Sequence, residues 1–191
     1  ALDAGFPADK IVFAGVGKAD WEINLGLDND IFCFNVESAV ELEIINELAA
    51  AKHKVASIAL RINPEVDAHT HAKITTGMKE NKFGINLSQL GGVLDKLKEM
   101  KNVKLIGIHS HIGSQITDMS SFRNLVIRFN EIQEELEAHG VTVENLNFGG
   151  GLGIDYYHPN HLSIPAFDNY FAAIHKLLQV RPGQQVHFEP G

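Results

Sequence analysis

One apolar stretch carries two histidines a single residue apart and then breaks into a glycine turn. In IGIHSHIGSQI, residues 106–116, a period of two places Ile106 and Ile108 on one face of a predicted strand. His109 and His111 fall on the opposite face. Two histidines in this arrangement could bind a metal ion, lie in a polar layer or contact a flat ligand. The other motifs of the sequence are needed to choose among these three interpretations.

Apolar runs of strand length recur along the chain, and stretches with helical periodicity separate them. The strand-like runs are residues 10–16, 31–36, 55–62, 103–112, 144–148 and 185–188. The helical stripes lie within residues 41–51, 90–97, 122–136 and 167–178, with a predicted capping box at Ser38 to Glu41 at the start of the first. Regular alternation of strand and helix predicts a parallel sheet with crossover helices.

Polar or glycine-rich signatures follow nearly every predicted strand, which is typical of a (β/α)8 TIM-type barrel. A doubly wound sheet would instead carry G-x-G-x-x-G after its first strand, and that motif is absent there. Six strands are countable, so we expect an α/β fold in which residues 1–191 form an incomplete barrel domain of about six of eight βα units. The missing units are expected before Ala1. Edges near Lys10 and Gln185 would favour pairing with a second copy, so we expect a homodimer.

The amino-acid composition limits the kinds of partner and the cellular location that we expect. The chain has 191 residues, 45% of them hydrophobic, which is enough for one sizeable core. A net charge of −8 argues against nucleic acid, and no run is long and apolar enough for a membrane helix. The single cysteine, Cys33, cannot form an internal disulfide and indicates a reducing compartment. We therefore expect a cytoplasmic protein.

Three consecutive glycines follow the strand predicted at residues 144–148. Without Cβ atoms, the backbone N–H groups of Gly149, Gly150 and Gly151 can approach an anion such as phosphate, although a plain glycine turn would look the same. Barrel phosphate sites are built from the loops after the last strands, which favours the anion site. Ser114 can add a hydroxyl to it.

The histidines are open to two interpretations. A barrel metallohydrolase would use His109 and His111 with zinc and would need further ligands, for which His187 and Glu189 are available. A metal does not need a triple glycine, however. We therefore favour His111 stacking on a flat cofactor ring and His109 as a hydrogen-bonded histidine of the core, with no metal. The HTH motif at residues 69–71 is expected to be loop surface.

A flat ring, a phosphate and a carboxylate at the last strand together indicate pyridoxal phosphate. Glu189 beside the pyridine nitrogen would keep that nitrogen protonated, so that the ring accepts electrons released at a substrate's α-carbon. The alternative for Glu189 is a role as a buried ion-pair partner.

Seven segments, in the expected order along the chain, resemble the diaminopimelate decarboxylase family. The members of this family are pyridoxal-phosphate enzymes of the alanine-racemase-like barrel type. The segments are KIVFAGVGK, FNVESAVEL, ALRINPEVDAHTHAKITTG, ENKFGI, GIHSHIGSQI, LNFGGGLGIDY and EPG. Ornithine, arginine and carboxynorspermidine decarboxylases share the histidine-to-serine, triple-glycine and EPG elements. RINPEVDAHTH and HIGSQI favour the diaminopimelate branch.

The resemblance implies roles for particular residues. His111 matches the ring-stacking histidine, and Glu189 matches the acid at the pyridine nitrogen, so these two are the expected catalytic residues. Arg61 resembles an arginine that organises the carboxylates behind the cofactor. The expected cofactor-binding residues are His111, Ser114, Gly149, Gly150, Gly151, Glu189, Pro190, Gly191 and Arg61.

The resemblance also implies what this chain lacks. The lysine that bonds to the cofactor is expected before Ala1, and a C-terminal β domain with the substrate-selecting residues is expected after Gly191. Lys18 follows a predicted strand, but we interpret it as a surface cation near the next helix. The implied reaction is decarboxylation of meso-2,6-diaminopimelate, an amino acid, to L-lysine, with this fragment inactive alone. A related basic amino acid decarboxylase, a metal-dependent hydrolase and a non-enzymatic cofactor carrier are the alternatives.

Overall fold

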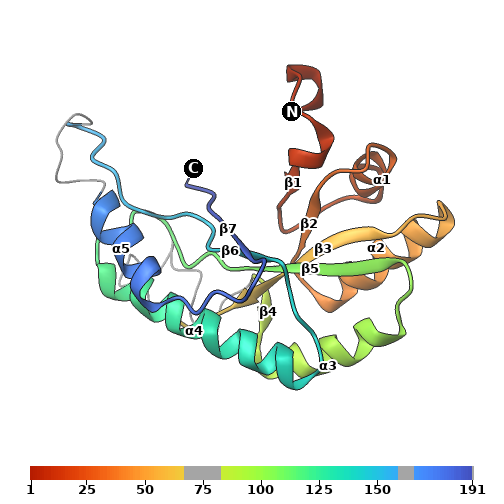
Figure 1. The fold of residues 1–191 in the computed structure, drawn as a ribbon. Coiled ribbons are helices and arrows are strands. Elements are labelled where there is room, and N and C mark those ends of the chain that lie inside the picture. Colours follow the sequence, from red (N-terminus) through yellow and green to blue (C-terminus); the bar gives the residue numbers. More distant parts are fainter. Residues whose placement is uncertain (67–82, 159–165, 191) are drawn as a thin grey trace.

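The computed structural model describes residues 1–66, 83–158 and 166–190, and within them a curved parallel sheet runs through the molecule (Figure 1). Six strands are hydrogen-bonded side by side in the order in which they occur in the chain, and every neighbouring pair is parallel. They are β1 (Val12–Phe13), β2 (Cys33–Val36), β3 (Ala56–Asn63), β5 (Val103–His109), β6 (Asn145–Asn147) and β7 (Gln185–His187). The predicted incomplete barrel of six strands is confirmed.

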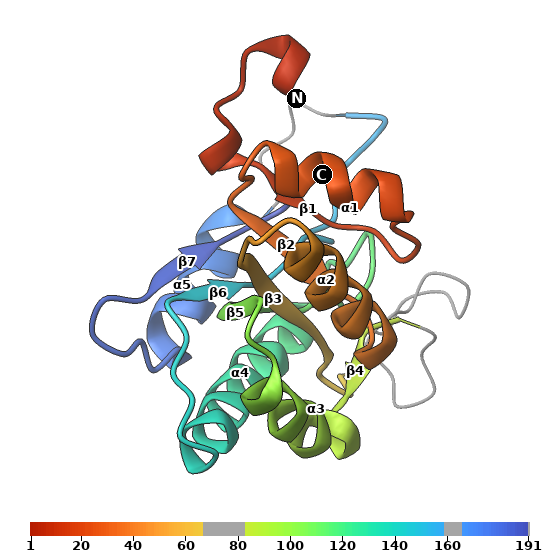
Figure 2. The same cartoon turned by 90° about the vertical axis from the view of Figure 1, so that its right-hand side faces the viewer.

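Helices connect the strands and cover one face of the sheet (Figures 1 and 2). They are α1 (Asp20–Asp28), α2 (Ala39–Ala51), α3 (Leu87–Glu99), α4 (Met119–Ala138) and α5 (Phe167–Leu177). The periodic stripes predicted four of these, whereas α1 was not predicted individually. Also unpredicted are the short strand β4 (Ile85–Asn86), which pairs with β3, and the 3-10 turns η1 (Leu2–Ala4) and η2 (Ala8–Lys10). No helix among the described residues is long and apolar enough to cross a membrane.

The main core lies between the sheet and this helical layer. It includes a stacked pair of rings, Phe129 of α4 and Phe148, whose centroids are 4.1 Å apart. A second, smaller cluster of Cys33, Ala59 and Ile106 packs separately from the main core, with Val12 and Phe32 beside it. These two clusters define the two faces of the sheet.

Ile106 lies on the face opposite to the one its sequence spacing predicts. The β3–β5 register pairs Ile58 with Leu105 and then Ala59 with Gly107, so Ile106 is the extra residue of a β-bulge. Ile108 belongs to the main core, but Ile106 joins Cys33 and Ala59 in the smaller cluster. The predicted shared face of Ile106 and Ile108 is therefore wrong, because the bulge interrupts the period of two.

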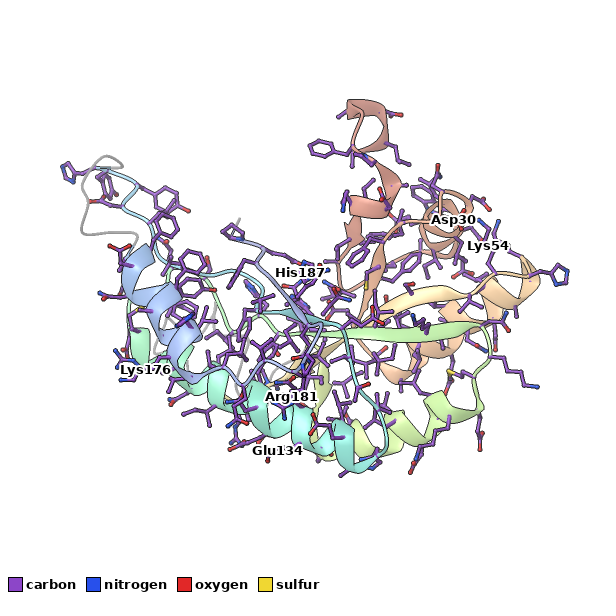
Figure 3. All side chains as sticks on the ribbon, in the orientation of Figure 1. Asp30, Lys54, Glu134, Lys176, Arg181 and His187 are labelled. Atoms are coloured by element: carbon purple, nitrogen blue, oxygen red, sulfur yellow. The ribbon has the colours of Figure 1, made fainter. Side chains whose placement is uncertain are left out.

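A polar row crosses the sheet near the carboxyl ends of its strands. Arg61 is in register with His109, His109 with Asn147, and Asn147 with His187. Figure 3 shows His187 at the sheet, away from Glu134 on the outer helix α4. Because side chains alternate between faces, the residues two positions beyond this row continue on the same side. Those residues begin the candidate site.

Candidate cofactor site

The fold places the Glu189 carboxylate next to the polar row. Its backbone N–H donates to the carbonyl oxygen of Gly149 at 2.8 Å, which ties the segment after β7 to the glycine loop after β6. Its Oε1 accepts two hydrogen bonds, from Asn147 Nδ2 at 2.7 Å and Asn35 Nδ2 at 3.2 Å. Its other oxygen, Oε2, lies 3.9 Å from His109 Nε2, which is too far for a hydrogen bond.

His109 is buried as predicted, with 3% of its surface exposed. The expectation that it is hydrogen-bonded is wrong, since neither ring nitrogen has a hydrogen-bond partner within the part of the chain that the structure describes. Burial, reinforced by the nearby Arg61 guanidinium, lowers the pKa of His109 to about 3. The ring is therefore neutral at neutral pH and does not form an ion pair with Glu189.

His111 lies two residues further along, at the predicted ring-stacking position. Its Nδ1 accepts a hydrogen bond from the Gly150 N–H at 3.3 Å, which orients the imidazole against the glycine loop. Burial, followed by the Arg61 charge, lowers the pKa of His111, although the Glu189 and Glu37 carboxylates act in the opposite direction. The lowered pKa favours the neutral form of the imidazole at this position.

The glycine loop is tightly packed against its neighbours, for a reason that differs from the predicted one. A Cβ on Gly150 would lie 2.0 Å from the carbonyl oxygen of Glu189, and one on Gly151 would lie 2.2 Å from that of Gly113. These glycines are thus required by contact with neighbouring backbone, whatever they bind. The contact with Gly113 also brings the turn that contains Ser114 against the loop.

Two hydrogen-bond donors at this loop remain available. The Gly149 N–H donates to Asn147 Oδ1 at 2.9 Å, and the Gly150 N–H is directed to His111. By contrast, no described residue pairs with the Gly151 N–H or the Ser114 hydroxyl, and the Ser114 residue is exposed. The donors free for an anion are therefore fewer than the three glycine N–H groups that the motif predicted.

Arg61 pairs with a carboxylate other than Glu189. One nitrogen of its guanidinium donates to both oxygens of Glu37, at 2.8 and 2.9 Å, and the ring of Phe83 lies 5.7 Å from the guanidinium carbon. Sequence analysis did not single out Glu37, which follows β2 on the site side. Arg61 therefore organises the Glu37 carboxylate and lowers the pKa of both histidines across the sheet.

Lys18 is not the surface cation that we predicted. Its side chain is only 1% exposed, and its Nζ donates to Glu41 Oε1 at 2.5 Å and to the carbonyl oxygens of Asn35 and Gly15 at 2.6 and 2.8 Å. All three donors of the ammonium group are thereby used. Lys18 is a buried structural cation beneath the site.

Sequence analysis missed Asn35 and Asn147 as parts of the site. Their signal was a buried polar residue within an apolar strand, which costs free energy unless it has a specific partner. Pro190 lies beside Gly150, whereas Gly191 and the HTH motif at residues 69–71 lie outside the described residues. No group of three or more His, Cys, Asp or Glu side chains in the described ranges is arranged to hold a metal ion.

The donor set fits pyridoxal phosphate. A carboxylate with one open oxygen can face a pyridine nitrogen, a neutral imidazole can face the ring, and the free Ser114 hydroxyl and Gly151 N–H can face a phosphate. These groups come from the loops after β5, β6 and β7, which are neighbours in the sheet. A cofactor site at the carboxyl ends of barrel strands is the arrangement expected for this fold.

The whole chain, residues 1–191, matches the family model described as pyridoxal-dependent decarboxylase, pyridoxal binding domain. The protein therefore belongs to the pyridoxal-dependent decarboxylases, and the domain is the one that binds their cofactor.

Its relatives within that family include diaminopimelate decarboxylases. That of Bacteroides thetaiotaomicron is 63% identical over 191 residues, and that of Haemophilus influenzae is 42% identical over 192 residues. The chain is fully covered in both comparisons and spans 50% and 45% of the length of these relatives.

Solved structures agree with this assignment. The diaminopimelate decarboxylase of Helicobacter pylori complexed with L-lysine superposes with a TM-score of 0.89 and 36% identity, over all of this chain and 47% of that one. The arginine decarboxylase of Paramecium bursaria Chlorella virus bound to agmatine gives a TM-score of 0.81 and 25% identity, over all of this chain and 48% of that one. The chain thus corresponds to about half of each related enzyme.

Proposed function

We propose that this chain is the cofactor-binding half of a diaminopimelate decarboxylase and that it holds pyridoxal 5′-phosphate through the residues described above. The observation that carries the cofactor assignment is the Glu189 carboxylate, which has one oxygen bound by two amides and the other without a hydrogen-bond partner among the described residues. When bound, pyridoxal phosphate supplies an electron sink for the pair left at a substrate's α-carbon after CO2 departs.

Each residue of the proposed site has a distinct role. Glu189 holds the proton on the ring nitrogen through a charge-assisted hydrogen bond. His111 packs on the ring face as a neutral imidazole. Ser114 and Gly151 bind the phosphate, and Gly149, Gly150 and Pro190 shape the loop around it. Arg61 keeps Glu37 paired, so that this second carboxylate does not compete for the ring nitrogen.

We propose meso-2,6-diaminopimelate as the substrate and L-lysine as the product. Support comes from the 63% identity to the Bacteroides thetaiotaomicron enzyme over the entire chain, against 25% to the viral arginine decarboxylase. The HIGSQI and RINPEVDAHTH segments also favour this branch. A related basic amino acid decarboxylase is the second candidate, because the viral structure shares the fold at a TM-score of 0.81.

The proposal also covers association of the protein with a second copy of itself. β1 and β7 each pair with a single neighbour in the described sheet, so residues 1–191 taken alone have two strand edges able to pair with another copy. We therefore propose a homodimer. The only cysteine of the chain, Cys33, is free and buried, which supports a cytoplasmic location.

A chimera tests the proposed activity. Residues 1–191 replace the matching half of the Bacteroides thetaiotaomicron enzyme, and CO2 release is measured with meso-diaminopimelate, L-arginine and L-ornithine. We expect turnover of meso-diaminopimelate alone and a roughly hundredfold loss in Glu189→Gln, the size of effect seen when one preorganised electrostatic group is removed. Glu144→Gln, at an exposed carboxylate before β6, is the matched control and should retain activity. Because the other half of the chimera comes from the Bacteroides thetaiotaomicron enzyme, the outcome that would contradict the proposal is a folded chimera that releases no CO2 from meso-diaminopimelate.

A further inference from the structure

Asn147 uses both ends of its side-chain amide within the site. Its Oδ1 accepts the hydrogen bond from the Gly149 N–H at 2.9 Å, and its Nδ2 donates to Glu189 Oε1 at 2.7 Å. Asn147 is buried at the end of β6, where the sheet fixes its backbone between His109 and His187. One rigidly held side chain therefore connects the glycine loop to the carboxylate.

Asn35 supplies the second donor to the same oxygen, at 3.2 Å. It lies on β2, which three strands (β3, β5 and β6) separate from β7 in the sheet order, and is fully buried. Its carbonyl oxygen accepts a hydrogen bond from Lys18 Nζ at 2.6 Å, and Lys18 is itself bound to Glu41. The buried lysine thus holds the strand that positions the Asn35 amide.

The two amides leave the oxygens of Glu189 unequal. Oε1 accepts two hydrogen bonds, whereas the nearest ring nitrogen to Oε2 is that of the neutral His109, at 3.9 Å. The Glu189 side chain is 37% exposed, so packing alone does not restrict its rotamer. Hydrogen bonds from two buried amides are what fix its orientation.

We propose that Asn35 and Asn147 are positioning residues that hold Glu189 Oε1 so that Oε2 is the oxygen presented to the ring nitrogen of the cofactor. Through its bond to Gly149, Asn147 also sets this carboxylate relative to the loop that binds the phosphate. This inference rests on the proposed role of Glu189 in cofactor binding and extends it to two residues that do not touch the cofactor.

The test uses the full chain and pyridoxamine 5′-phosphate labelled with 15N at the ring nitrogen. This probe has the ring and phosphate of the cofactor but no aldehyde, so it does not react with lysines. Fluorescence titration gives the affinity, and the 15N chemical shift gives the pH at which the bound ring nitrogen loses its proton. The neighbouring ionisable groups His109, His111, His187 and Arg61 are unchanged in every variant.

Asn35→Ala and Asn147→Ala should each weaken binding about threefold to tenfold, the effect of losing one hydrogen bond, and should lower the pH at which the ring nitrogen deprotonates. In a Glu189→Ala background, Asn35→Ala should have no further effect, whereas Asn147→Ala should retain a small loss because it also releases Gly149. Asn145→Ala is the matched control. It removes an amide of the same strand that bonds Ile106 and His187, and it should leave both readouts unchanged.

The outcomes separate the two proposals. If the wild-type chain does not bind the probe, or if Glu189→Ala changes neither readout, the proposed cofactor role of Glu189 is wrong and the inference fails with it. If Glu189→Ala changes both readouts but the asparagine variants weaken binding equally in both backgrounds, or behave like Asn145→Ala, only the inference is overturned. Asn35→Ser and Asn147→Ser, too short to reach Glu189, replace any alanine variant that fails to fold by circular dichroism.

Discussion

His109 is a buried histidine held in its neutral form by its surroundings. Both ring nitrogens lack partners within the described ranges, which costs free energy for each polar group left unsatisfied. The Arg61 guanidinium lies near enough for its charge to oppose protonation of this ring. Retaining a histidine here keeps the polar row continuous below the cofactor site, at the expense of stability.

This burial predicts acid sensitivity. An unfolded histidine binds a proton below its ordinary pKa of about 6.5, whereas folded His109 does so only below about 3. Because the unfolded state binds more protons between these values, the free energy of unfolding falls as pH decreases from about 6.5 towards 3. At pH ~5 the loss due to His109 is up to about 2 kcal/mol.

Urea unfolding of wild type and His109→Leu at neutral pH and at pH ~5 measures this contribution. The variant should be at least as stable at neutral pH, because the unsatisfied nitrogens are gone, and should lose less stability on acidification. His175→Leu, at an exposed position of α5, controls for the replacement itself. Equal acid sensitivity in wild type and His109→Leu would show that His109 is not the group responsible.

Gly150 gives a second prediction for a single residue. Gly150→Ala places a methyl group 2.0 Å from a backbone carbonyl oxygen that cannot move alone, so we expect a loss of roughly 1–3 kcal/mol or more. The matched control is Gly92→Ala in α3, where nothing lies within 4 Å, and where alanine should stabilise the helix by about 0.5–1 kcal/mol. Thermal unfolding compares the two variants, and equal stability would contradict the close approach.

At the level of elements, the sequence predicted the strands and most helices because hydrophobic periodicity reflects which face is buried. It could not predict the bulge at Ile106, since bulges depend on the register with the neighbouring strand. Of the two hydrogen bonds that define the capping box predicted at Ser38, the structure contains one. Ser38 accepts from the Glu41 N–H at 3.1 Å, but the Glu41 carboxylate bonds the Glu37 N–H and Lys18 instead of completing the box.

The Lys18–Glu41 pair joins the start of α1 to the first turn of α2, and it should therefore matter to stability. Lys18→Met leaves a largely buried carboxylate without its cation, and we expect a loss of roughly 3–5 kcal/mol. Lys96→Met breaks the exposed Lys96–Glu43 pair and should cost no more than about 1 kcal/mol. Urea unfolding distinguishes these values, and similar losses for the two variants would argue against a structural role for the buried pair.

At the level of the whole molecule, the candidate site is assembled from residues far apart in the chain. Glu189 meets Asn35 across 154 positions of sequence and Asn147 across 42. Motif resemblance pointed to His111, Ser114, the glycines and Glu189 because their local patterns are distinctive. The asparagines and Glu37, the partner of Arg61, could not be assigned in this way, because their roles depend on which strands become neighbours.

The order of the strands has a consequence for how the chain reaches this structure. Each of the six parallel strands lies beside the one before it in sequence, apart from the small detour of β4, so the sheet lengthens in a single direction from β1 to β7. A chain leaving the ribosome from its N-terminus can add each new strand to an edge that is already formed. No later strand has to open an existing pair, which suits the domain to folding while it is being synthesised.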